Sequence, residues 1–130
     1  MDDTLKIPDK IYDGFSSQFN LELKEYTDDL VHALWHVEMS DLNPAGIVHG
    51  GASFSVADAM CATLGYRTLH VLTKSVRYFY YHSLVIGDVD VMCRFKRKGS
   101  FTSLMEVELI QDEKVCMKGF FDMAKMKGTL

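Results

Sequence analysis

The segment from Asn43 to Asp58 concentrates the residues that could do chemistry. Within it, Gly50 and Gly51 open a run of small and apolar residues that predicts a helix, so we expect both glycines at a helix start. The first N–H groups of a helix have no partner inside the helix. Such amides can stabilise an oxygen that gains negative charge, as the carbonyl oxygen of an acyl group does when it is attacked. The alternative is that the two glycines only make a tight turn into the helix.

Asp58 is the only formally charged residue in the helical run 50–66. Aspartate is a poor helix former, and burial of an unpaired carboxylate costs free energy. One interpretation is a structural carboxylate that accepts hydrogen bonds from neighbouring hydroxyls, such as those of Ser53, Ser55 or Thr63. The other interpretation is a general base or nucleophile in a partly dry cleft.

Gly50 and Asp58 are too far apart on one helix to act on the same atom. Eight residues separate them, which corresponds to about 12 Å along a straight helix. Reacting groups must come within about 3 Å of their target atoms. A second copy of the chain could supply the missing half, because a twofold axis can place the start of each helix near the middle of the other. We therefore expect a homodimer with two shared sites.

The remainder of the chain predicts an antiparallel sheet that covers this helix. Apolar and other residues alternate with a period of two in several segments, namely 19–23, 31–37, 76–81, 88–96, 101–109 and 115–123. Short turns at 98–100 and 111–114 join the last three segments. Sequential strands with short turns form antiparallel sheets, and a nearly all-apolar helix must be covered. We predict an α+β fold, with a curved sheet around one helix and a single domain over residues 1–130.

Composition narrows the possible functions. The 130 residues are 48% hydrophobic and carry a net charge of −4, the wrong sign for binding nucleic acid through its phosphates. No apolar run approaches the roughly 20 residues of a membrane span, and the acidic start has no secretory signal pattern. The three cysteines are widely spaced and form no C-x-x-C pair, which argues against a disulfide framework or zinc site. We expect a cytoplasmic enzyme or ligand-binding domain that contacts neither membrane nor nucleic acid.

The pattern N-x-x-G-x-x-H-G-G from Asn43 to Gly51, followed by Asp58, resembles the hotdog-fold acyl-CoA thioesterases of the phenylacetate-pathway type. The resemblance extends over about residues 19–123 and includes the Gly87-Asp88 turn. It implies a five- to six-stranded antiparallel sheet around one helix, in a homodimer with one continuous sheet and often a homotetramer. The implied reaction is hydrolysis of an acyl-CoA to free acid and CoA, without metal or cofactor.

The resemblance also implies roles for individual residues. Asp58 matches the catalytic carboxylate, and Gly50 matches the residue whose N–H polarises the thioester carbonyl. Asn43 and His49 match side chains that line the site, with Asn43 orienting the water or the carbonyl. Thr73 falls where related enzymes carry a serine or threonine that helps to hold the water.

Further residues are predicted to contact the substrate. Gly51 would allow close approach of the ligand to the backbone. A basic cluster at a predicted hairpin end could contact the CoA phosphates, although a solvated hairpin end also explains it; the cluster comprises Arg94, Lys96, Arg97 and Lys98. Relatives usually have a proline after the strand at 76–81, and residues 80–84 have none, so the rim of the acyl pocket is expected to differ.

Two other functions stay open. A hotdog hydratase or dehydratase would use a histidine with an acid, and His49 and Asp58 could supply them. A non-catalytic acyl-CoA-binding protein would bind the ligand without turnover. We predict no metal site, because His32 and His36 on one strand face lack a third ligand. A serine hydrolase is rejected because residues 51–55 lack the closing glycine of G-x-S-x-G.

Overall fold

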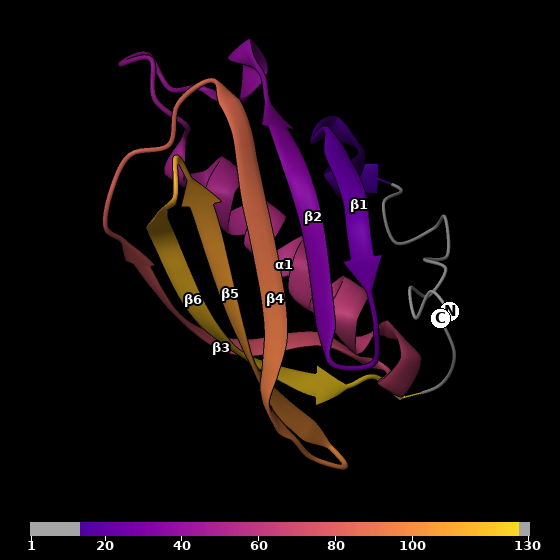
Figure 1. Cartoon of the computed structure of the whole chain (residues 1–130). Helices are drawn as coiled ribbons and strands as arrows, with labels where there is room; N and C mark the ends of the chain where they lie inside the picture. The colour runs from indigo at the N-terminus through magenta and orange to yellow at the C-terminus, as the bar shows by residue number, and fades with distance from the viewer. Residues whose placement is uncertain (1–13, 128–130) are drawn as a thin grey trace.

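The computed structural model describes residues 14–127, so the acidic start lies outside the described residues. Within this range, the helix α1 (Gly50–Gly65) lies against one face of a six-stranded antiparallel sheet (Figure 1). The strands are β1 (Leu21–Tyr26), β2 (Leu30–Val37), β3 (His70–Tyr80), β4 (Gly87–Lys98), β5 (Thr102–Gln111) and β6 (Lys114–Lys125). Their order in the sheet is β1-β2-β4-β5-β6-β3. The predicted α+β architecture, a sheet wrapped around one helix, is confirmed.

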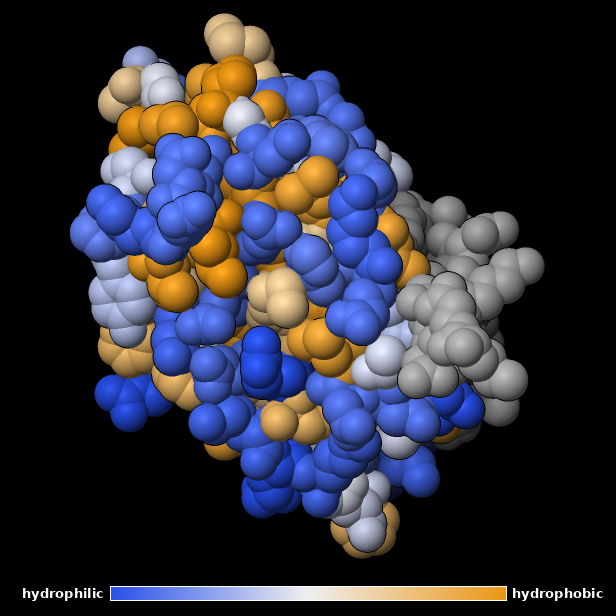
Figure 2. All heavy atoms as spheres, in the orientation of Figure 1, coloured by the Kyte–Doolittle hydropathy of each residue, from blue (hydrophilic) through white to orange (hydrophobic). Residues whose placement is uncertain are grey.

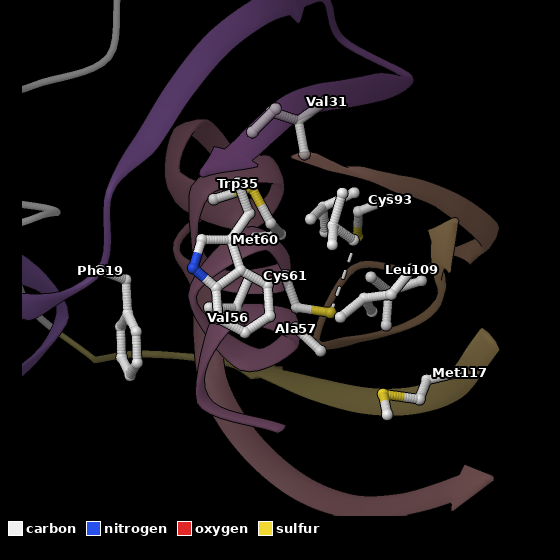
Figure 3. Close-up of a cluster of buried hydrophobic side chains, with 14 of the residues drawn as sticks. Phe19, Val31, Trp35, Val56, Ala57, Met60, Cys61, Cys93, Leu109 and Met117 are labelled. Carbon is white, nitrogen blue, oxygen red and sulfur yellow. Dashed lines mark hydrogen bonds between the residues drawn. The ribbon is translucent and has the colours of Figure 1, made fainter. Parts of the chain in front are cut away.

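The core lies between α1 and the sheet, as the alternation predicted. Val31, Ala33, Trp35 and Val37 of β2 are all buried, while the residues between them are partly exposed. Figure 3 shows Trp35 beside Met60 of α1 within this cluster. The opposite face of the sheet carries mainly hydrophilic side chains with apolar ones between them (Figure 2). One face of the sheet is therefore committed to covering the helix.

The three cysteines are free and buried, and two of them meet in the core. The Sγ atoms of Cys61 in α1 and Cys93 in β4 are 3.6 Å apart (Figure 3). Burial raises the pKa of the Cys61 thiol, so this group stays protonated. The pair packs as two small apolar side chains that join the helix to the sheet.

Strand β3 begins at His70, earlier than the alternation at 76–81 predicted. The helix is followed directly by a 3₁₀ turn, Tyr66–Thr68, and Leu69 then reverses the chain in the left-handed conformation at φ 61°. Residues 70–75 hide the strand pattern because two register shifts interrupt their pairing with β6. Strand β3 is an edge of the sheet, and most of its residues are partly or fully exposed.

The two predicted turns join β4 to β5 and β5 to β6. The second turn contains Asp112 and Glu113, both with positive φ, which is the backbone shape of a tight hairpin. Phe101 is the exception to the predicted alternation, since it is 78% exposed and β5 begins only at the next residue. The hairpin connections place β4, β5 and β6 side by side, as predicted.

Candidate active site

The start of α1 exposes one backbone donor, as the sequence predicted. His49 is the N-cap residue: its Nδ1 accepts a hydrogen bond from the Gly51 N–H at 2.9 Å, and its carbonyl oxygen accepts from Ala52 and Ser53. Among the described residues, no hydrogen bond is found for the Gly50 N–H, and Gly50 is partly exposed. The Gly50 amide is therefore free to bind an external oxygen.

The geometry around Gly51 explains why a glycine is needed there. A Cβ atom at this position would lie 3.1 Å from Nδ1 of His49, so a side chain would displace the imidazole. Since Nδ1 accepts the Gly51 N–H, neutral His49 carries its proton on Nε2. The Gly51 N–H is already occupied within the chain, and contact of Gly51 with substrate stays a prediction.

Asn43 lies beside Gly50 and shapes the loop that leads into the helix. Its Oδ1 accepts hydrogen bonds from the backbone N–H groups of Ala45 at 2.9 Å and Ile47 at 3.3 Å. This use of the oxygen leaves the Nδ2 amide as a donor. Asn43 and Gly50 line one cavity of about 260 Å³. The structure thus brings these two predicted site residues together.

His49 and Gly51 line a different cavity, on the other side of the helix start. Its volume is about 380 Å³, and Phe15, Phe19 and Asp41 form part of its wall. The five residues predicted for catalysis are therefore not gathered in one pocket of a single chain. Two cavities are therefore found at the start of α1, and each is lined by part of the predicted set.

Thr73 meets Asp58 directly. Its hydroxyl donates a hydrogen bond of 2.5 Å to Asp58 Oδ1, and the Thr73 hydroxyl oxygen also lies 3.5 Å from the sulfur of Met123. Asp58 is partly buried in the middle of α1, and Thr73 belongs to the edge strand β3. The structure therefore brings these two predicted site residues together, and the role of Thr73 in holding water stays a prediction.

The hydroxyls expected to satisfy a structural Asp58 do not contact it. Ser53, Ser55 and Thr63 instead donate to backbone carbonyls three or four residues earlier in α1, at 3.0, 2.7 and 2.8 Å. The proposed partners of the structural interpretation are therefore wrong. Hydroxyls inside a helix bond readily to the carbonyl one turn earlier, which leaves the carboxylate to a partner from another element.

Asp58 and Gly50 stay about 12 Å apart along the axis, because α1 runs unbroken from Gly50 to Gly65. The helix presents Gly51, Ser55, Asp58 and Ala62 at least partly exposed on one face. One chain alone therefore does not bring the Gly50 amide and the Asp58 carboxylate to one reacting carbon.

The basic cluster lies far from the helix start. Lys98, at the end of β4, lines a cavity with Leu64 and Arg67 at the other end of α1. Most cations of the basic cluster have partners in the chain. Lys96 pairs with Glu106 at 3.3 Å and Lys98 with Asp29 at 2.6 Å, and Arg97 donates to the Thr102 carbonyl oxygen at 3.4 Å. The structure does not bring Arg94 and its neighbours to Gly50 or Asp58 within one chain, so contact with CoA phosphates stays a prediction.

His32 and His36 do share the outer face of β2, and each pairs with carboxylates. His32 Nε2 lies 2.7 Å from Asp90 Oδ1, and His36 bridges Asp88 at 2.7 Å and Glu22 at 2.9 Å. Among residues 14–127, no group of three or more histidine, cysteine or acidic residues is arranged to hold a metal ion. In the same range, no helix has the length and apolar character to span a membrane.

Tyr80 is a contact of the site that sequence reasoning did not assign. It lies at the end of β3, and its hydroxyl donates to the Gly50 carbonyl oxygen at 3.1 Å. The sequence places Tyr80 only in the alternating segment 76–81 and in the expected pocket rim at 80–84. No sequence signal marks this hydrogen bond, because it joins residues 30 positions apart through the topology of the sheet.

Solved structures share the fold of this chain at low sequence identity, while no protein-family model and no curated protein matches the sequence. A Streptococcus mutans UA159 protein bound to acetyl-CoA gives a TM-score of 0.78 at 20% identity, over 85% of this chain and 92% of that chain. Thioesterase superfamily member 2 of zebra fish gives 0.80 at 18% identity, over 90% and 91% of the two chains.

The PaaI protein from the phenylacetic acid degradation operon of E. coli gives a TM-score of 0.78 at 16% identity. The match covers 88% of this chain and 85% of that chain. Like these proteins, the chain folds as a central helix against a six-stranded antiparallel sheet, and it therefore has the hotdog fold.

Proposed function

We propose that the protein is an acyl-CoA thioesterase, which hydrolyses an acyl-CoA thioester to a carboxylic acid and CoA. The observation that carries the proposal concerns two groups of α1. The Asp58 carboxylate accepts a hydrogen bond from the Thr73 hydroxyl of β3, and the Gly50 N–H at the start of the helix has no partner among the described residues. An acid and an oxyanion donor are the two groups that acyl transfer to water requires. The structural neighbour with acetyl-CoA bound supports a CoA thioester as the ligand.

In the proposed mechanism, each group has its own step. Thr73 occupies Oδ1 of Asp58 and leaves Oδ2 for a water molecule. As general base, Asp58 takes a proton from this water while the water oxygen attacks the thioester carbon; as nucleophile, its oxygen attacks that carbon itself. The carbonyl oxygen becomes negative and accepts from the Gly50 N–H, with the Asn43 Nδ2 amide as a second donor. The intermediate then expels the CoA thiolate. On the base route, the proton on Asp58 passes to the thiolate and the acid is released directly; on the nucleophile route, water hydrolyses the acyl–Asp58 anhydride to the acid and restores the carboxylate. This scheme uses no metal or cofactor.

The proposal includes a homodimer, because the Gly50 amide and the Asp58 carboxylate must come from different copies. Two exposed features support it. The small residues Gly51, Ser55 and Ala62 flank Asp58 and allow a second helix to approach closely. Strand β3 leaves one sheet edge unpaired in the described chain, and its Leu72 is 45% exposed. Pairing of two such edges would give one continuous sheet and set the two helices side by side.

The hydratase alternative is disfavoured by the hydrogen bond at the helix start. A histidine that removes a proton needs a free lone pair, and His49 uses its Nδ1 lone pair to accept the Gly51 N–H. Release of free thiol from acyl-CoA, without a reversible change in enoyl absorbance, separates the two reactions.

A panel of acyl-CoA substrates with thiol detection tests the proposal on the wild type and on Asp58→Asn. We expect the variant to lose about a thousandfold or more in kcat with unchanged unfolding behaviour. Equal rates would remove Asp58 from the mechanism. Binding of acyl-CoA by the wild type without turnover would instead favour the non-catalytic binding protein.

Gly50→Pro tests the oxyanion donor selectively. Proline has no N–H, is favoured at the first helical position, and requires an extended residue before it. His49 has φ −59° and ψ 132°, which meets that requirement. We expect kcat to fall by about 100- to 1000-fold with the fold retained. Gly50→Ala keeps the N–H, and its Cβ would lie in ordinary contact with Tyr80 at 3.5 Å, so it is the matched control.

Mixing the two inactive variants tests the shared site. In a hybrid dimer of Asp58→Asn and Gly50→Pro, one site carries both defects and the other carries none. Random exchange of subunits should therefore restore about a quarter of the wild-type activity. Absence of any recovery after verified exchange, or full activity in a monomer by light scattering, would refute the shared site.

A further inference from the structure

We propose that Tyr80 is a positioning residue for the Gly50 amide and that it acts together with His49. The inference rests on the proposed function, since it assigns Tyr80 to the oxyanion donor of that site. The two side chains contact the peptide group between Gly50 and Gly51 at both of its polar atoms, and the Ser53 hydroxyl also donates to its carbonyl oxygen, at 3.0 Å.

The two hydrogen bonds belong to one planar unit. The Gly50 carbonyl oxygen accepts from the Tyr80 hydroxyl at 3.1 Å, and the Gly51 N–H donates to His49 Nδ1 at 2.9 Å. The C=O and N–H of a peptide group lie in the same plane and point in opposite directions. Tyr80 from the end of β3 and His49 from the N-cap therefore fix the plane from both ends.

This plane adjoins the peptide group between His49 and Gly50, which carries the free Gly50 N–H. Glycine has the most backbone freedom of any residue, so Gly50 at a helix end would otherwise sample several conformations. The preceding peptide group is already held, because the His49 carbonyl accepts from Ala52 at 2.9 Å and Ser53 at 3.2 Å. With the following peptide group also held, the Gly50 N–H is preorganised toward one position of the oxyanion.

Tyr80 is itself held in place by aromatic contacts. Its ring packs edge-on against Tyr78, with 4.9 Å between the ring centroids. Tyr78 packs in the same way against Phe54 of α1, with 5.4 Å between the ring centroids. Tyr80 nevertheless remains 53% exposed and lines the cavity of Asn43 and Gly50. An exposed hydroxyl has water as an alternative partner, so fold stability does not require its bond to Gly50.

Kinetics on Tyr80→Phe test the positioning role. We expect kcat to fall about tenfold, less than when a donor is removed, while KM stays within about twofold. Tyr66→Phe, at the far end of α1, is the control for loss of a tyrosine hydroxyl and should keep the wild-type rate. In a His49→Ala background the effect of Tyr80→Phe should shrink, because the peptide group is already loosened. Wild-type kcat, a change in KM alone, or additive losses would overturn the proposal.

Amide hydrogen exchange gives a readout that does not depend on turnover. In the substrate-free protein, we expect the Gly51 N–H to exchange about fivefold faster or more in Tyr80→Phe, with the Met60 amide unchanged. Unchanged Gly51 exchange in an active enzyme would refute the positioning role of Tyr80 but not the proposed function. Faster exchange in a protein that releases no thiol from any acyl-CoA would refute the proposed function, while the hold of Tyr80 on the Gly50–Gly51 peptide group would stand.

Discussion

The two ends of α1 differ in how their backbone groups are satisfied. At the C-terminal end, the Thr63 carbonyl accepts a buried hydrogen bond of 2.7 Å from the Tyr26 hydroxyl, and Gly65 is in tight contact with the His70 backbone. At the N-terminal end, the Gly50 N–H has no partner among the described residues and opens into a cavity. One helix thus has a closed end that joins it to the sheet and an open end that offers a donor.

The closed end extends into the strands that follow it. His70 is buried, with Nδ1 at 2.8 Å from the Ser103 hydroxyl and Nε2 at 3.2 Å from the Ser100 carbonyl oxygen. Both ring nitrogens therefore have partners, as buried polar groups require. The comparison indicates that stability is concentrated at the C-terminal end of α1, whereas the N-terminal end is left incomplete for a ligand.

The same substitution at the two ends should give the largest contrast. A Cβ at Gly65 would lie 2.1 Å from the His70 carbonyl oxygen, which neither backbone can avoid without moving. We expect Gly65→Ala to lower the free energy of unfolding by about 3 kcal/mol or more. Gly50→Ala meets only the Tyr80 ring at 3.5 Å and should cost less than about 1 kcal/mol. Chemical denaturation measures both, and equal losses would contradict the closed-end assignment.

Gly51→Ala should affect turnover more than stability. The new Cβ at 3.1 Å from Nδ1 would require the His49 ring to shift by a few tenths of an ångström and would weaken the N-cap hydrogen bond. Loss of such a cap costs about 1 kcal/mol. We expect kcat to fall about tenfold or more, because the peptide group behind the Gly50 donor is released. A drop in unfolding free energy as large as that of Gly65→Ala, with turnover preserved, would reverse the assignment of the two ends.

Tyr26→Phe removes a hydrogen bond from the closed end with little change in shape. The Thr63 carbonyl would keep the Tyr66 N–H but lose the buried Tyr26 hydroxyl, so we expect a loss of about 1 kcal/mol in unfolding free energy. Turnover at a temperature where the variant stays folded should match the wild type. Reduced kcat in the folded variant would show that the closed end also supports catalysis.

The sequence predicted the parts of the site that depend on local pattern. The small, apolar run fixed α1 within one residue, and the paired glycines located its open start. The partner of Asp58 was harder to predict from nearby residues, because the helical hydroxyls of Ser53 and Thr63 bond to the backbone instead. Family resemblance, and not periodicity, suggested Thr73. Its strand segment is interrupted by register shifts and shows no alternation.

The contact between Tyr80 and Gly50 depends on tertiary structure alone. In the sequence, Tyr80 resembles other aromatic residues at the end of a strand. Its hydroxyl reaches Gly50 because β3 directly follows α1 in the chain and returns to the start of the helix. The separation of the basic cluster from Gly50 has the same cause. Strand β4 ends beside the closed end of α1, so the cations of residues 94–98 gather there.

The smallest effect is expected from a pH-dependent contact beside the open end. His36 lies near the end of β2. Its hydrogen bond to Glu22 and, to a smaller extent, its hydrogen bond to Asp88 raise its pKa above 6.5. Because the pKa of His36 is raised in the folded state, the contact stabilises the fold in full at pH values below the pKa of the unfolded chain, about 6.5. This contribution is lost as the pH rises through the higher folded value. The stability deficit of His36→Gln should therefore be larger at low pH than at high pH, in the range where the fold persists.

The closed end provides the control for this pH dependence. The hydrogen bond that Tyr26→Phe removes from the Thr63 carbonyl is neutral, so its contribution to the deficit should be the same at both pH values. Denaturation of the two variants and the wild type, each at pH 6 and pH 8.5, compares the deficits directly. If the His36→Gln deficit were constant or grew with pH, the paired carboxylates would not be stabilising a protonated imidazole. The contacts of His36 with Glu22 of β1 and Asp88 of β4 would then stabilise the sheet as neutral hydrogen bonds.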